Sequence, residues 1–164
     1  MAAGAADALY RFHDGCAAGA AGREEIGVSQ SVFTTVARPP AAALASAIAA
    51  LAARFGNHLV TSQAVREQHA HTTTWIPPQP PDAVVMAQTV ADIQDVVRIC
   101  AQHRVPVVAF GTGTSLEGQV NAPAGGVCID LRDMNRVLAV HADDLDCVVE
   151  PGITRKLLNE HLRD

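Results

Sequence analysis

The spacing of apolar residues predicts an α-helix over residues 41–55. Four large apolar residues follow one another at spacings of four, three and four: Leu44, Ile48, Leu51 and Phe55. This spacing puts them on one face of an alanine-rich helix, and Gly56 is suited to end it in a left-handed conformation. A shorter helix is expected from Ser62, as its N-cap, to about Gln68.

From residue 82 onward the pattern indicates strands and helices in alternation. The run "AVVMA" (83–87) predicts a buried strand, and "PVVAF" (106–110) predicts the next one. Between them Thr89 is the expected N-cap of a helix, with Asp92 in the position of a capping box. Apolar residues recur at i, i+3, i+4 and i+7 along that helix, at positions 93, 96, 97 and 100. Together these segments predict a βαβ unit.

The last 40 residues predict three more strands and a helix. "VCIDL" (127–131) indicates a third strand, and "RVLAV" (136–140) and "DCVVE" (146–150) indicate two antiparallel strands around an exposed acidic turn. Thr154 is the expected cap of a final helix. The fold class is therefore α+β, a small mixed sheet with helices on it. We expect a loosely ordered arm with some helix over 1–40, a helical segment and Pro-rich connector over 41–77, and the main fold over 78–164.

Composition and charge narrow the possible partners and location. The formal net charge is −5 with a single lysine, which argues against binding to nucleic acid. The four cysteines lie far apart without a C-x-x-C pair, so neither a disulfide framework nor a metal site is predicted. No apolar run is long enough to span a membrane, and the N-terminus lacks the features of a secretory signal. These observations favour a cytoplasmic protein.

The segment "FGTGTSLEGQV" after the second strand is the main candidate for chemistry. It fails the phosphate-binding P-loop pattern, because Gln119 stands where the lysine is needed. It also fails the dinucleotide-binding pattern G-x-G-x-x-G, because Leu116 occupies the third glycine position. Small residues from Gly111 to Ser115 can still present backbone amides to an anion without any cationic side chain. On the residues alone, anion binding and a simple linker remain equally open.

The order and spacing of several pieces carry a resemblance. The lead-in "REQHAHTTTWIPPQPPDAVV", the G-T-G-T-S-L-x-G loop, "IDL..MNRVL" and "V.PGIT...LN..L" resemble the flavin domain of FAD-linked oxidases of the vanillyl-alcohol-oxidase type. Within that superfamily the chain is most similar to the branch of the cytochrome-linked D-lactate dehydrogenases and the glycolate oxidases. The resemblance implies the first lobe of a PCMH-type FAD-binding domain.

The resemblance also implies which residues bind the cofactor. The pyrophosphate of FAD would lie on the loop backbone, the following residues would shape the turn, and a second segment would approach from a neighbouring strand end. These residues are Gly111, Thr112, Gly113, Thr114, Ser115, Leu116, Gly118, Pro151, Gly152 and Ile153. Some relatives carry a histidine bound covalently to the flavin where this chain has Thr114, so non-covalent FAD is expected.

By the same resemblance, the intact protein oxidises a D-2-hydroxy acid such as lactate or glycolate to the keto acid. Electrons then pass to a cytochrome or another carrier. The family's substrate domain, catalytic residues and metal ligands have no counterpart in this sequence, so no catalytic residue or metal ligand is named. We therefore expect an incomplete FAD-binding domain. The alternative is a truncated, non-catalytic remnant that binds no flavin by itself.

Three further residues have expected structural roles. His69, which with His71 could be read as a metal pair, is expected in a solvated connector. Asp130 is expected to cap the turn after the third strand. Trp75 is expected to pack the connector onto the domain.

Overall fold

The computed structural model describes residues 37–71 and 73–163, which fall within one compact unit. Most of the arm predicted over 1–40 lies outside the described residues. The divisions predicted at 40/41 and 77/78 stay predictions. Throughout the described part, no helix is both long and apolar enough to cross a membrane.

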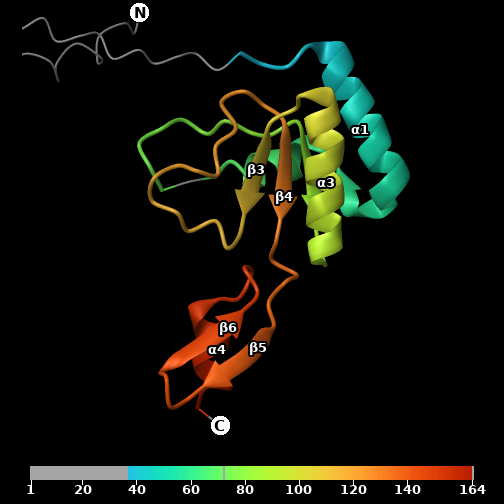
Figure 1. Ribbon diagram of the computed structural model, residues 1–164. Helices are drawn as coiled ribbons and strands as arrows, with labels where there is room; N and C mark the ends of the chain where they lie inside the picture. The colour runs from blue at the N-terminus through green and yellow to red at the C-terminus, as the bar shows by residue number, and fades with distance from the viewer. Residues whose placement is uncertain (1–36, 72, 164) are drawn as a thin grey trace, which may run out of the picture. The chain divides into compact units, whose positions relative to one another are not determined.

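A four-stranded sheet forms the centre of this unit (Figure 1). Its strands are β1 (Leu59–Val60), β2 (Ala83–Met86), β3 (Val107–Phe110) and β4 (Val127–Asp130). The order is β1-β2-β4-β3, with β4 parallel to both of its neighbours and β1 antiparallel to β2. The two strands of the predicted βαβ unit are therefore parallel but not adjacent, because β4 lies between them. All four residues of β4 are buried, which fits its central position.

The helices differ in length and in how many of their side chains are buried. They are α1 (Ala41–Phe55), a short 3₁₀ turn (Gly56–His58), α2 (Gln63–Gln68), α3 (Val90–His103) and α4 (Arg155–His161). The predicted apolar face of α1 is confirmed, with Leu51 and Phe55 buried beside α3. Val96 and Cys100 of α3 are also buried, whereas Val97 is exposed. One face of the sheet packs on these two helices, as Figure 1 shows.

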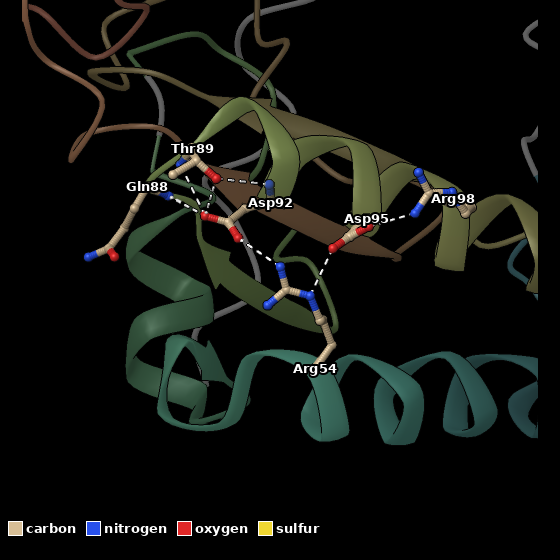
Figure 2. A network of polar contacts seen from close by, with 6 residues as sticks. All are labelled: Arg54, Gln88, Thr89, Asp92, Asp95 and Arg98. Atoms are coloured by element: carbon tan, nitrogen blue, oxygen red, sulfur yellow. Dashed lines mark hydrogen bonds and ion pairs between the residues drawn. The ribbon is translucent and has the colours of Figure 1, made fainter.

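A polar network joins the ends of α1 and α3 (Figure 2). Arg54 Nε donates to Asp95 Oδ2 at 2.8 Å, and its Nη2 lies 3.3 Å from Asp92 Oδ1. Asp92 is the acidic member of the predicted capping box, which is confirmed: its backbone amide donates to the Thr89 hydroxyl, and the Thr89 amide donates to its carboxylate. The helix cap and the contact between helices thus share one carboxylate.

The C-terminal elements form a hairpin and a short helix. Strands β5 (Val137–His141) and β6 (Asp146–Val149) pair antiparallel around the acidic turn, as predicted. The Thr154 hydroxyl accepts the Leu157 amide at 3.2 Å, so this predicted cap is also confirmed. Buried Glu150 accepts the Arg136 amide and guanidinium, which fixes the base of the hairpin.

In the connector before β2, the position of Trp75 differs from the prediction. The Trp75 side chain is 92% exposed, so it does not pack onto the domain. Ile76, the next residue, lies against Gly118 instead. The connector therefore contacts the glycine-rich segment through the residue next to the tryptophan.

Candidate functional site

The glycine-rich loop leaves the end of β3 and lines an open hollow of about 440 Å³. Its walls come from β3, the loop and the turn after β6: Ala109, Gly111, Thr112, Gly113, Thr114, Ser115, Gln119, Val120 and Pro151. No charged side chain is among them. Any ligand held here is contacted by backbone groups, hydroxyls and one carboxamide.

The backbone amides of residues 111–115 are available to such a ligand. Within the described residues, none of these five N–H groups donates a hydrogen bond to a protein acceptor. Unpaired backbone donors next to one another are the elements of an anion-binding nest. The adjoining hydroxyls are paired among themselves: Thr112 Oγ1 lies 3.1 Å from Thr114 Oγ1, and Ser115 donates to Gln119.

The turn of the loop depends on glycine at position 113. Its φ is +71°, and a Cβ atom there would lie 2.6 Å from Cζ of Phe110. The backbone therefore turns directly against the tip of the Phe110 ring. Gly111 is different, since its φ is ordinary and a Cβ would meet only the Pro151 carbonyl oxygen, at 3.4 Å.

The turn after β6 lies beside the loop because a hydrogen bond and close backbone packing fix its position. The Gly152 amide donates to Met134 O at 2.8 Å, and a Cβ at Gly152 would overlap the carbonyl oxygen of Leu131. This close approach places Pro151 beside Gly111. Two segments 40 residues apart in the sequence thus lie side by side in the lining of the hollow.

The predicted cofactor-binding residues divide into two groups. Six line the hollow: Gly111, Thr112, Gly113, Thr114, Ser115 and Pro151. The other four lie outside its lining. The Leu116 side chain is 77% exposed, Gly118 has a φ of +81° and packs on the connector, and Ile153 donates its amide to Glu150 O. Gly152 acts through its close backbone contact.

Behind the loop lies a buried group that the sequence did not indicate. His69 is 1% exposed and lies 2.9 Å from Asp130 through Nε2, so the expected solvated connector is wrong for this residue. Asp130 accepts the Arg132 amide at 2.9 Å, which confirms its turn role, and it also binds the Arg132 guanidinium. The two partners are 61 residues apart, and no local pattern relates them.

The cysteines near the sheet are not candidates for chemistry. Burial raises the pKa of Cys128 to about 12, and burial likewise raises the pKa of Cys100 to about 11. Thiols of this kind are protonated near neutral pH and behave as small apolar side chains.

Comparison with known proteins identifies the relatives of this chain. Over 101 residues it is 48% identical to a probable mitochondrial D-lactate dehydrogenase of Danio rerio, covering 62% of this chain and 20% of the relative. Over 84 residues it is 44% identical to the mitochondrial D-lactate dehydrogenase [cytochrome] of Arabidopsis thaliana, covering 51% of this chain and 15% of the relative. The chain thus spans a fifth or less of these relatives. Both are named as mitochondrial, so a cytoplasmic location is not confirmed.

Solved structures show the same fold. The 4-ethylphenol oxidase of Gulosibacter chungangensis matches with a TM-score of 0.69 and 28% identity, over 77% of this chain and 25% of that one. A p-cresol methylhydroxylase matches with a TM-score of 0.66 and 22% identity, over 76% of this chain and 25% of that one. The predicted α+β fold of the PCMH type is confirmed.

The family comparison covers the segment that contains the hollow. The FAD binding domain family matches residues 81–164, just over half of the chain. This range includes β2 to α4, the glycine loop and the turn at Pro151. The chain therefore belongs to the FAD binding domain family, whose cofactor is FAD.

Proposed function

We propose that the hollow at the glycine loop holds the diphosphate of FAD. The main supporting observation concerns the five backbone amides from Gly111 to Ser115, which lie in the lining of the hollow. In the part of the chain that the structure describes, none of them donates to a protein acceptor. A diphosphate needs several donors close together, and backbone amides supply them without flexible side chains. The residues present therefore fit this part of the cofactor.

In this proposal each segment has a separate task. The loop amides bind the phosphate oxygens. Whichever of the Thr112 and Thr114 hydroxyls accepts in their mutual hydrogen bond adds a donor, and Pro151 lines the hollow beside Gly111. When bound, FAD supplies a group that accepts a hydride and passes on electrons singly. No histidine, cysteine or tyrosine lines the hollow, which supports non-covalent attachment.

We further propose that the intact protein is a flavoprotein oxidoreductase for D-2-hydroxy acids, of the D-lactate or glycolate type. Two relatives are named as D-lactate dehydrogenases, and one of these names includes cytochrome. A cytochrome or a similar one-electron carrier is the matching acceptor. This chain's part is to hold the cofactor in position, and none of its described residues is assigned to the substrate.

Titration of FAD into the purified chain, followed by flavin fluorescence, tests the cofactor site. Gly113→Ala should weaken binding, because a side chain at a φ of +71° forces the turn off the Phe110 ring. Gly56→Ala is the matched control, since Gly56 also has a positive φ, of +51°, but has open space around it and lies away from the hollow. Equal effects of the two variants would contradict the proposed site. Absence of binding by the unaltered chain at high FAD concentration would favour the alternative, a remnant that binds no flavin by itself.

A further inference from the structure

Both ring nitrogens of His69 face groups that can only accept hydrogen bonds. Nδ1 lies 2.7 Å from the carbonyl oxygen of Val65, and Nε2 lies 2.9 Å from Oδ2 of Asp130. The ring is therefore held at both nitrogens, by α2 on one side and by β4 on the other.

Asp130 is the ionised partner in this arrangement. Burial would raise the pKa of its carboxyl, but hydrogen bonds from His69 and Arg132 outweigh burial and lower the pKa to about 2. Arg132 donates through Nε and Nη2, the latter at 2.6 Å. The carboxylate therefore lies between the Arg132 guanidinium and the His69 ring, which is buried and held on both sides.

The Phe110 ring connects this pair to the glycine loop. The His69 and Phe110 ring centroids are 4.6 Å apart and tilted by 52°, and the Arg132 guanidinium lies 5.7 Å from the Phe110 centroid. Gly113 turns on the same ring, so closely that a Cβ there would lie 2.6 Å from it. His69, Phe110 and Gly113 thus follow one another from the interior to the hollow.

We propose that His69 is a positioning residue for the cofactor site. Held between Val65 and Asp130, it fixes the Phe110 ring and so sets the direction of the loop amides on the other side. The predicted effect on FAD binding rests on the proposed function, whereas the predicted effect on the orientation of the loop amides does not. The residue is not among those that line the hollow, and it acts through Phe110.

The test uses the ¹⁵N-labelled chain and reads the loop directly by NMR. His69→Phe keeps an aromatic ring beside Phe110 but removes both polar contacts of the ring nitrogens, and it should shift the amide resonances of Gly111 to Ser115. FAD should then bind about tenfold more weakly, which is the effect expected from the loss of about one hydrogen bond to a charged group.

Two controls separate positioning from a general loss of stability. Arg54→Ala weakens the contact between α1 and α3. The partners that Arg54 loses are Asp92 and Asp95 of α3, so the resonances of the loop amides should stay unchanged. His71→Phe makes the same substitution at an exposed site two residues away. If His69→Phe does not fold, Phe110→Leu serves instead and should move the resonances of the loop amides.

Two results would overturn the proposal. The first is an unchanged set of loop amide resonances in His69→Phe, and the second is an equal change of those resonances in Arg54→Ala. Failure of the unaltered chain to bind FAD would count against the proposed function only, because the loop amides still report on His69.

Discussion

Removal of the Asp130 charge should change how stability depends on pH. The side chain is 2% exposed, and its pKa is lowered from 3.8 to about 2 by its contacts with His69 and Arg132, against the opposing effect of burial. A carboxyl whose pKa is lower in the folded than in the unfolded state contributes stability above the unfolded value. That contribution is lost as the pH falls through the folded value.

The magnitude follows from the two pKa values. At 1.36 kcal/mol per pKa unit, the difference corresponds to roughly 2 kcal/mol in total. Of this, about 1.5 kcal/mol should disappear between pH 5 and pH 2.5. Histidine side chains in water are protonated throughout that range, so the change reports on carboxyl groups.

Urea unfolding followed by circular dichroism at these two pH values measures the effect. The unaltered chain should lose more stability on acidification than Asp130→Asn, by about 1.5 kcal/mol. Asp133→Asn, at an exposed position in the same turn, is the matched control and should follow the unaltered chain. Parallel pH dependences for the unaltered chain and Asp130→Asn would show that folding does not lower the pKa of Asp130.

Three further substitutions test separate parts of the fold, each by urea unfolding. Gly113→Ala should lower the unfolding free energy by about 1–2 kcal/mol, since its φ is positive and Phe110 is in the way; no loss would mean that the turn is formed differently. Arg54→Ala should destabilise modestly, and the loss should shrink at high salt because its acidic partners are partly exposed; a salt-independent loss would argue against ion pairing. Gly152→Ala should lower the unfolding free energy most of the three, because the added Cβ atom would overlap the backbone of Leu131. A variant as stable as the unaltered chain would show that this turn can move away from Leu131.

Features that depend on neighbouring residues could be predicted from the sequence. The capping box needs only Thr89 and Asp92, and the hairpin needs only two strands around an acidic turn. The glycine with a positive φ at the end of α1 is likewise a local requirement. These features were all expected and all are present.

Features that depend on distant pairing could not be predicted in this way. The insertion of β4 between β2 and β3 is decided by which strand is buried on both faces, and a single apolar run does not reveal that. His69 follows a short polar helix and gives no sign that Asp130 lies beside it in the fold. The sequence nominates the loop residues as candidates, but the contact between Gly113 and the Phe110 ring depends on the three-dimensional structure.

We propose that the backbone amides from Gly111 to Ser115 bind the diphosphate of FAD. Amide NMR spectra of the ¹⁵N-labelled chain, recorded during titration with FAD, observe these five groups one by one. We predict that these five resonances move most, that ADP reproduces the movement, and that riboflavin, which lacks phosphate, does not. FAD binding that leaves these five resonances in place and moves amides elsewhere would contradict the claim.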